Sequence, residues 1–387
     1  MILITEKEKC CGCGACFAVC PQGCITMKKD GEGFLYPQID SRHCSGCGLC
    51  GKACPVLHKP MLMTGLKTYS AYNRDEAVRR KSSSGGVFTA LAQYILSLGG
   101  AVFGAAFDPQ FQARHICVEY PEELHKLRSS KYMQSSTNDT FRQALDILKE
   151  NRPVLYTGTP CQIAGLRSFL KKDYEKLYTQ SIICHGVPSP KVWEKYLTFF
   201  GDDKAVHAVE FRNKDNGWKK YRLKIEKNDG DYLATAREDP YLQAFIKNLS
   251  LRPSCGSCTF KSYEQPADIT LADYWGVEQL EPELDDDKGL SLLFIHSEKG
   301  SRLFEHAQEK LVFQPANGQK AVLYNPSLLK ASVPHKKRAF FFENLENYPF
   351  DKLVEKCLRL SMAEKLRQKI GYNTLRIKNR LKHLKKK

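Results

Sequence analysis

The chain has 387 residues, of which 42% are hydrophobic and 26% are charged, and it carries 16 cysteines. These values are ordinary for a globular protein and allow two or three domains with a large buried core. No apolar run approaches the length of a membrane span, and the first residues lack the basic and apolar regions of a secretory signal. We therefore expect a cytoplasmic protein whose cysteines are metal ligands or redox groups, not disulfides.

The formal net charge of +16 is concentrated at the C-terminus. Residues 365–387 hold ten Lys or Arg and no acid, which leaves about +6 for the rest of the chain. No nucleic-acid-binding motif accompanies this charge, so we expect no nucleic-acid partner. Residues 341–387 are predicted to form a basic helical tail. A solvated or partner-docking helix fits residues 369–387 at its end, and so does peripheral contact with an anionic membrane.

Residues 1–58 are predicted to form a ferredoxin-like domain with two iron–sulfur clusters. The pattern C-x2-C-x2-C-x3-C-P occurs twice, ending at Pro21 and at Pro55. This spacing is typical of bacterial ferredoxins with two [4Fe-4S] clusters, in which the fourth cysteine of each run ligates the other cluster. The predicted ligands are Cys10, Cys13, Cys16 and Cys54 for the first cluster, and Cys44, Cys47, Cys50 and Cys20 for the second. Zinc is the alternative, although structural zinc sites favour two separated C-x2-C pairs.

A connector at residues 59–67 leads to a larger α/β domain at residues 68–340. Its predicted elements are a helix at 87–98, strands at 101–108 and 114–120, a helix at 140–151, a strand at 153–158, a helix at 161–170, a strand at 180–186, a helix at 191–200, a β-rich insertion at 205–236, a helix at 240–249, strands at 268–276 and 291–297, and a helix at 301–311. Thr159 and Pro160 are typical of a helix start. The fold class is therefore α+β.

Two cysteines of this domain lie where α/β proteins build sites. Cys161 follows one buried strand, and Cys184 lies at the end of another. Open α/β sheets bind ligands at such strand ends. The remaining cysteines outside the ferredoxin pattern, Cys11, Cys24, Cys117 and Cys357, are predicted to be packed thiols.

An ordered series of motifs resembles the coenzyme F420 hydrogenase/dehydrogenase beta-subunit family over about residues 1–300. After the ferredoxin runs come K-x-x-SGG from Lys81, SKY-x-QS from Ser130, TGTPCQ from Thr157, CHGVPS from Cys184, FR-x-K-x-x-GW from Phe211, C-x2-C from Cys255 and ADYWG from Ala272. The resemblance implies an iron–sulfur flavoprotein oxidoreductase.

In that family a flavin, usually FAD with FMN as the alternative, exchanges a hydride with the deazaflavin F420 or another small molecule. The clusters exchange single electrons with a redox partner protein, which is a ferredoxin or an enzyme subunit. The resemblance further implies a third [4Fe-4S] cluster on Cys161, Cys184, Cys255 and Cys258, with a zinc site as the alternative. The substrate does not follow from the fold. A non-catalytic subunit that only delivers electrons to a partner enzyme is the alternative function.

Candidate cofactor-binding residues are Lys81, Ser84, Gly85, Gly86, Ser130, Lys131, Tyr132 and Gln134. The SGG segment lies at a helix N-terminus, where free N–H groups favour an anion such as a flavin phosphate, but it is also an ordinary helix cap. Residues 130–134 suit phosphate or flavin-ring contacts, or form a solvated loop.

Candidate substrate-binding residues are Arg212, Lys214 and Trp218, which could instead form the solvated face of a hairpin with a packed tryptophan. His185 is the candidate catalytic residue, because its pKa suits proton exchange near a flavin. The other interpretation of His185 is a hydrogen-bond donor to a cluster sulfur.

Overall fold

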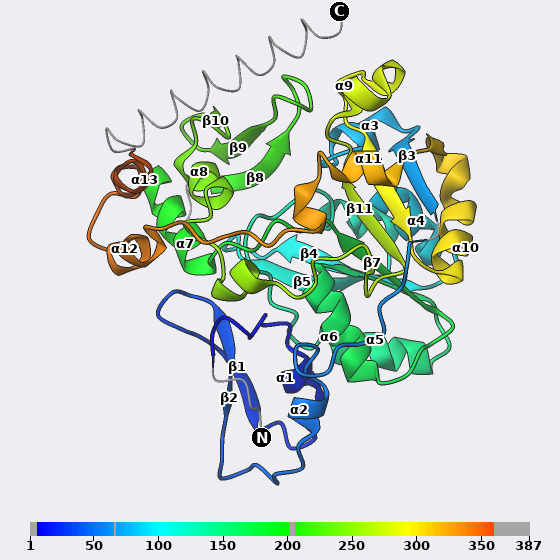
Figure 1. The fold of residues 1–387 in the computed structure, drawn as a ribbon, viewed down its shortest axis with the longest axis horizontal. Helices are drawn as coiled ribbons and strands as arrows, with labels where there is room; N and C mark the ends of the chain where they lie inside the picture. Colours follow the sequence, from blue (N-terminus) through cyan, green and yellow to red (C-terminus); the bar gives the residue numbers. More distant parts are fainter. Residues whose placement is uncertain (1–5, 66, 202–205, 360–387) are drawn as a thin grey trace, which may run out of the picture.

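The computed structural model describes residues 6–65, 67–201 and 206–359. A mixed sheet with strand order β13-β3-β12-β11-β7-β6-β4-β5 forms its centre (Figure 1). The strands are β3 (Lys67–Asn73), β4 (Ala101–Phe107), β5 (Ala113–Val118), β6 (Val154–Gly158), β7 (Leu177–Ile182), β11 (Ile269–Asp273), β12 (Ser291–Ile295) and β13 (Leu311–Pro315). The four inner neighbours β11, β7, β6 and β4 run parallel, so their carboxyl ends meet at one edge.

Helices cover both faces of this sheet. On one face, Val102 of β4 and Leu155 of β6 pack under α4 (Val87–Ser97) and α10 (Glu298–Ala307). On the other face, Phe103 and Tyr156 pack against α5 (Thr140–Lys149) and α6 (Pro160–Leu170). Successive residues of a strand point to opposite faces, which is why neighbours in β4 and β6 belong to different cores.

The N-terminal domain lies below the helix pair α5 and α6 in Figure 1. It consists of α1 (Ala15–Val19), the antiparallel pair β1 (Ile25–Lys29) and β2 (Leu35–Ile39), and α2 (Leu49–Lys52). Arg142 of α5 donates from Nε to the carbonyl of Ala18 at 2.9 Å and from Nη2 to that of Phe17 at 2.9 Å. These bonds fix the end of α1 to the larger domain.

A second, three-stranded antiparallel sheet and its helices form the left part of Figure 1. It contains β8 (Val206–Asn213), β9 (Arg222–Lys227) and β10 (Tyr232–Thr235), with α7 (Pro190–Leu197), α8 (Pro240–Ile246), α12 (Arg338–Glu343) and α13 (Phe350–Leu358). Their aromatic and aliphatic side chains share one core, which includes Trp193, Tyr241 and Phe341. Shorter helices are α3 (Glu76–Arg80), α9 (Val277–Leu280) and α11 (Gly318–Val322).

The mixture of helices and sheets confirms the α+β prediction. Most predicted elements are present within a few residues of their expected bounds. The strand expected at 180–186 instead spans Leu177–Ile182, because β6 and β11 pair with it only up to that point. The strands β1, β2, β3 and β13 were not predicted.

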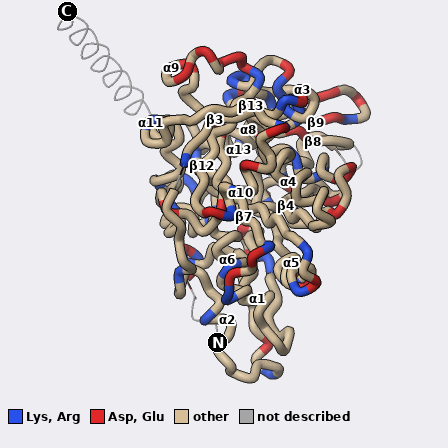
Figure 2. Tube along the Cα trace, turned by 90° about the vertical axis from the view of Figure 1, so that its right-hand side faces the viewer, with Lys and Arg blue, Asp and Glu red and all other residues tan. Residues whose placement is uncertain are grey.

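In the described part of the predicted tail, α12 and α13 bury Phe341, Leu353 and Cys357. The solvated or partner-docking helix and the membrane contact considered for residues 369–387 lie outside the described residues. Figure 2 shows Lys and Arg interspersed with Asp and Glu, densely so near α3, α9 and β9. Among the described residues, no helix is long and apolar enough to cross a membrane.

Candidate functional site

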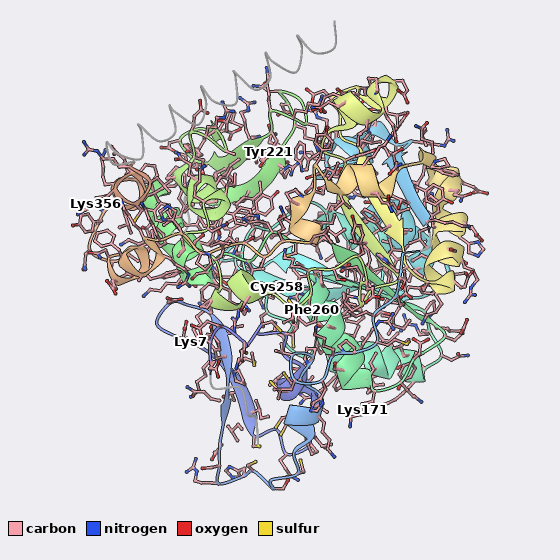
Figure 3. The ribbon with its side chains drawn as sticks, in the orientation of Figure 1. Lys7, Lys171, Tyr221, Cys258, Phe260 and Lys356 are labelled. Carbon is pink, nitrogen blue, oxygen red and sulfur yellow. The ribbon has the colours of Figure 1, made fainter. Side chains whose placement is uncertain are left out.

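Four cysteines from three segments of the chain line one cavity of about 270 Å³: Cys161, Cys184, Cys255 and Cys258. Cys161 lies in the first turn of α6, and Cys184 lies two residues after β7. Because β6 and β7 are parallel neighbours, the segments that follow them emerge side by side. Cys255 and Cys258 come from the segment after α8, and Figure 3 shows Cys258 above the N-terminal domain.

The four thiols are close enough to affect one another. Burial raises the pKa of Cys184, an effect that Lys261 opposes and that the charges of Cys255, Cys161 and Cys258 reinforce. Burial also raises the pKa of Cys255 to about 11, with contributions from Cys161 and Cys258. Lys261 places a cation beside them and donates from Nζ to the carbonyls of Cys184 and, at 2.8 Å, of Ser327.

This donor set fits an iron–sulfur cluster. Thiolates are soft ligands that bind Fe–S clusters or zinc. Among the described residues, no three His, Cys, Asp or Glu side chains converge as ligands of a single metal ion do. The four thiols instead surround a cavity. A cubane held by Cys161, Cys184, Cys255 and Cys258 fits this arrangement, and Lys261 would partly neutralise its charge.

Cys11 lines the same cavity, although it lies outside the ferredoxin pattern. Its thiol is within hydrogen-bonding distance of those of Cys13 and Cys161. It is therefore a packed thiol, as predicted, but one that lies between the N-terminal domain and the cavity. Its position could not be read from the sequence, because it depends on how the two domains dock.

The ferredoxin-run cysteines come together in the N-terminal domain. Burial, with the nearby charges of Cys10 and Cys54, raises the pKa of Cys16 to about 12. Cys54 thus lies near Cys10 and Cys16, and Cys50 lies close enough to contribute to the pKa of both Cys16 and Cys54, so the exchange of the fourth ligands stays a prediction. In the second group, Cys20, Cys44 and Cys50 pack around one small core, and Cys47 is exposed. Cys24 belongs to that core, with its Sγ 3.4 Å from that of Cys20.

A larger cavity of about 550 Å³ adjoins the first. The two share a wall that includes Cys11, Cys161, Cys184 and His185. Of the predicted cofactor and substrate residues, Ser84, Gly86, Ser130, Lys131, Tyr132, Gln134 and Arg212 line this larger cavity. Gly86 is the N-cap of α4, so the free N–H groups of that helix begin at the cavity wall.

Four predicted residues lie elsewhere. Lys81 forms a surface ion pair with Glu210 at 2.6 Å. Gly85 packs against β3, where a Cβ atom would come within 2.4 Å of the Ala71 carbonyl oxygen. Lys214 donates to three backbone carbonyls, those of Arg79, Ser84 and Lys288. Trp218 is buried behind the wall and stacks on Trp275, with ring centroids 4.7 Å apart.

Lys131 places a half-buried ammonium group at the larger cavity. Its Nζ donates to the carbonyls of Arg128 at 2.7 Å, Lys126 at 3.0 Å and Ser129 at 3.3 Å. Burial lowers the pKa of Lys131 to about 7. Because these three bonds use all of its N–H groups, Lys131 would act on a phosphate-bearing cofactor through its charge and not through a direct hydrogen bond.

Arg212 points a fixed cation at the same cavity. Its Nη1 lies 2.8 Å from Asp273 Oδ2, and Nη1 also donates to the Tyr132 hydroxyl at 3.2 Å. Burial opposes the charge of Arg212, but Asp273, Tyr132 and Tyr221 together outweigh it and raise the pKa of the guanidinium. The guanidinium carbon lies 4.0 Å from the centroid of the ring of Tyr221, the residue before β9, which Figure 3 shows beside the second sheet.

Two buried side chains at this cavity carry polar atoms that lack partners among the described residues. The atoms are Nε and Nη2 of Arg212 and Oε1 of Gln180, and the two residues are 5% and 3% exposed. Buried polar groups are rarely left unpaired, so a ligand with both acceptors and a donor would satisfy them. Gln180 could not be identified from the sequence, because an isolated glutamine in a strand carries no motif.

His185 lies in the shared wall with a defined tautomer. The Asn248 side chain donates from Nδ2 to the Val333 carbonyl at 2.8 Å, which turns its Oδ1 toward His185 Nε2 at 2.7 Å. Nε2 therefore carries the proton, and Nδ1 is the acceptor. Burial lowers the pKa of His185, so the ring is neutral at pH 7.

His115 also lines the larger cavity and was not among the predicted site residues. Its Nε2 donates to the Thr157 carbonyl at 3.0 Å, and Nδ1 lies 3.1 Å from Ser135 Oγ. Gln162 Nε2 donates to the same Oγ at 3.0 Å. This network holds the 130–135 segment against β6 and α6. No motif contains His115, which reaches the site only because β5 is an edge strand beside β4.

Comparison with known proteins agrees with this geometry. Family models for the N-terminal and C-terminal parts of the coenzyme F420 hydrogenase/dehydrogenase beta subunit match residues 68–141 and 151–319, and a 4Fe-4S dicluster domain model matches residues 9–57. The chain belongs to this family. It is an iron–sulfur member of a family of oxidoreductase components, and its N-terminal domain supports a role in electron transfer.

Individual relatives are distant. The coenzyme F420-dependent sulfite reductase of Methanocaldococcus jannaschii is 26% identical over 321 residues, which cover 78% of this chain and 46% of the relative. A subunit of the F(420)H(2) dehydrogenase of Methanosarcina mazei is 26% identical over 188 residues, which cover 45% of this chain and 52% of the relative. The chain thus spans about half the length of these curated relatives.

Among solved structures, a chain of the F420-reducing [NiFe] hydrogenase complex from Methanosarcina barkeri is similar, with 19% sequence identity and a TM-score of 0.49. The similarity covers 74% of this chain and 94% of that chain.

Proposed function

We propose that the protein is a flavin-dependent iron–sulfur oxidoreductase that links one-electron transfer through [4Fe-4S] clusters to hydride exchange with a small organic molecule. The observation that carries this proposal is the shared wall. Cys161 and Cys184, two proposed ligands of the third cluster, line both the small and the large cavity. A one-electron carrier held by these thiols would lie directly against the cofactor site.

A flavin in the larger cavity would supply the conversion between single electrons and hydride that clusters alone cannot make. The unpartnered groups of Arg212 and Gln180 match the carbonyl oxygens and the N–H of an isoalloxazine ring. The N-terminus of α4 at Gly86 is suited to its phosphate or phosphates, and the nearby charge of Lys131 would favour the same anion. These residues fit FAD and FMN alike.

His185 is proposed to hold or accept a proton at Nδ1. With Nε2 donating to Asn248, a neutral ring has no second N–H to offer a cluster sulfur. The geometry therefore favours proton acceptance over the alternative of donation to sulfur. A neutral imidazole at the junction of the two cavities is suited to take a proton as charge changes there.

The names of the relatives guide the proposal for substrate and partner. Both are named for coenzyme F420, so a deazaflavin is the substrate class that we propose first. One relative is named as a subunit, which supports a partner protein that exchanges electrons with the N-terminal domain. In the N-terminal domain, Cys47 is exposed, so the proposed second cluster lies near the surface where such a partner could approach. A subunit that only relays electrons is the second candidate.

Anaerobically purified protein tests these proposals. We expect about twelve iron atoms from three four-iron clusters and one flavin per chain. The double variant Cys255→Ala/Cys258→Ala should lose about a third of the iron and should no longer reduce its flavin with reduced ferredoxin. The matched control is Cys117→Ala/Cys357→Ala, which alters two thiols that line neither cavity.

The two candidate functions then separate by their electron donors. An oxidoreductase should bleach its flavin absorbance with reduced F420 or another low-molecular-weight hydride donor. A relay subunit should do so only with its protein partner. Protein that contains zinc in place of iron, or that keeps full iron in the Cys255/Cys258 variant, would contradict the proposed path.

A further inference from the structure

Arg252 joins the two cluster-bearing parts of the molecule. It lies three residues before Cys255, whose backbone N–H donates to the Arg252 carbonyl at 3.0 Å. Its side chain extends in the other direction, into the N-terminal domain. There Nε donates to the Cys10 carbonyl at 2.8 Å and Nη2 to the Leu35 carbonyl at 3.0 Å.

The same guanidinium reaches a predicted cluster ligand. Arg252 Nη2 lies 3.7 Å from Cys10 Sγ, within the range of a hydrogen bond to sulfur. Close approach depends on Gly12, where a Cβ atom would come within 2.9 Å of the Arg252 guanidinium carbon. Gly12 has φ of +69°, a conformation that further favours glycine at this position.

Arg252 differs from the other buried arginines in lacking a carboxylate partner. Of the described residues, three arginines are 5% exposed or less: Arg79, Arg212 and Arg252. Arg79 pairs with Asp286 at 2.7 Å, and Arg212 pairs with Asp273 at 2.8 Å. Within the described part of the chain, no Asp or Glu forms an ion pair with Arg252, whose remaining bond is to Gln134 Oε1 at 3.0 Å.

An unpaired buried cation is costly, because burial removes its hydration. The faces of Tyr36 and Phe34 lie 4.2 and 5.5 Å from the guanidinium carbon and offset part of that cost. Hydrogen bonds to the oxygens of Cys10, Leu35 and Gln134 offset more of it, and a negative charge beside Cys10 would balance the remaining positive charge. A cluster held by four thiolates supplies one there, and it becomes more negative when it is reduced.

We propose that Arg252 is a positioning residue with two effects. It stabilises the reduced form of the cluster ligated by Cys10, and it holds the part of the N-terminal domain around Cys10 against the segment that carries Cys255. A charged hydrogen bond to a ligand sulfur raises the reduction potential of a cluster, and a dry environment strengthens the effect. The electron is thereby held at the cluster adjoining the larger domain. This inference rests on the proposed electron path. Arg252 also lines the small cavity near Cys161 and Cys255, but Cys10 is the sulfur within its hydrogen-bonding reach among the described residues.

Arg142 offers a matched control. It also donates two hydrogen bonds to carbonyls of the N-terminal domain, those of Phe17 and Ala18, but it contacts no cysteine sulfur among the described residues. Arg252→Gln, Arg252→Lys and Arg142→Gln should be prepared anaerobically as full chains. Their iron content and the reduction potentials of their clusters should be measured by EPR-monitored redox titration.

In Arg252→Gln we expect the potential of one N-terminal cluster to shift downward while the other N-terminal cluster keeps its value. Arg252→Lys should stay closer to wild type, because it retains the cation, and Arg142→Gln should not shift either potential. Iron loss from Arg252→Gln alone would also support the inference, since the charge would then be needed to hold the cluster.

Unchanged potentials in an iron-replete Arg252→Gln variant would overturn the inference. Equal iron loss from Arg252→Gln and Arg252→Lys would also overturn it, because shape and not charge would then be decisive. This result can be told apart from a failure of the proposed function. The shift in cluster potential can be measured whether or not the protein binds flavin. If the protein reduces its flavin but the potential does not shift, only the role of Arg252 is contradicted.

Discussion

The carboxylate of Asp273 binds Arg212 through Nη1 alone, at 2.8 Å, and leaves Nε and Nη2 of the same guanidinium without partners among the described residues. Asp273 also accepts from Trp218 Nε1 at 3.3 Å, so the carboxylate is fixed from a second side. The ion pair thus holds the guanidinium in one orientation and directs its remaining donors at the cavity. Within this one side chain, Nη1 forms the ion pair, and Nε and Nη2 are available to a ligand.

This separation predicts the effect of Arg212→Lys. Lysine keeps the positive charge opposite Asp273, but its ammonium lacks the planar fork that directs Nε and Nη2 of arginine at the cavity. We expect flavin affinity to fall by about 10- to 100-fold, which corresponds to roughly 1.5–3 kcal/mol for hydrogen bonds to a charged donor. Flavin fluorescence during titration of the flavin-free protein measures this.

The control for Arg212→Lys is Arg114→Lys, which alters an ion pair with Asp108 away from the cavity. Flavin binding by that variant should match the wild type. Wild-type affinity in Arg212→Lys would show that its free N–H groups do not bind the cofactor.

The proximity of Cys20 and Cys24 predicts that Cys24 can replace Cys20 as a ligand of the second N-terminal cluster. Their Sγ atoms are 3.4 Å apart, and Cys24 is also near Cys44. In Cys20→Ala, the thiol of Cys24 is therefore placed to replace the missing ligand. We expect this variant to retain most of its iron with an altered EPR spectrum, whereas Cys20→Ala/Cys24→Ala should lose about four iron atoms. Cys24→Ala alone should keep its iron. Loss of the full cluster from Cys20→Ala alone would rule out the substitution.

Gly165 allows a steric test of the contact between the N-terminal domain and the larger domain. It lies on α6, where an added Cβ atom would come within 2.8 Å of Cys13 Sγ and 2.9 Å of Cys13 Cβ. Alanine normally stabilises a helix by about 1 kcal/mol relative to glycine. Here we expect Gly165→Ala to destabilise the protein and to perturb the EPR signal of the Cys13-ligated cluster, while the other N-terminal cluster keeps its signal. An unperturbed signal with a higher Tm would show that the domains separate easily at this contact.

Much of this site follows from local sequence, and the rest depends on tertiary packing. The ferredoxin runs and the motifs at Ser84, Ser130 and Arg212 carry their chemistry in short segments, so their candidate residues could be named from spacing and resemblance. Lys81 and Lys214 share those motifs, yet each is bound elsewhere, Lys81 to Glu210 and Lys214 to backbone carbonyls. A motif fixes which residues are present but not the direction in which each side chain points.

Residues that reach the site from outside a motif could not be identified in this way. Gln180 lies on a buried strand, and Arg252 becomes important only where the N-terminal domain meets the segment before Cys255. Trp275 was visible within the ADYWG motif, but its place in the cavity wall, with Trp218 stacked behind it, depends on the approach of two distant segments. Long-range contacts of this kind leave no periodic signal in the sequence.

The last prediction concerns acid stability and the buried His115. Burial lowers the pKa of His115 from 6.5 to about 4, and the residue is 3% exposed. Because the folded pKa is below the unfolded value, the unfolded chain takes up the proton first as the pH falls. The stabilisation is therefore complete above about pH 6.5 and is lost progressively toward pH 4. Between pH 7.5 and pH 5 this one group should cost about 2 kcal/mol of unfolding free energy.

His115→Gln removes the titration while its amide can still donate to Thr157 and accept from Ser135. We expect the Tm of this variant to fall less than that of the wild type between pH 7.5 and pH 5, with both measured at one scan rate. Acid damage to the clusters is common to the two proteins and cancels in the comparison. His207→Gln, at an exposed position, should follow the wild type. If His115→Gln lost as much Tm as the wild type over this range, the neutral His115 would not be a source of the acid sensitivity.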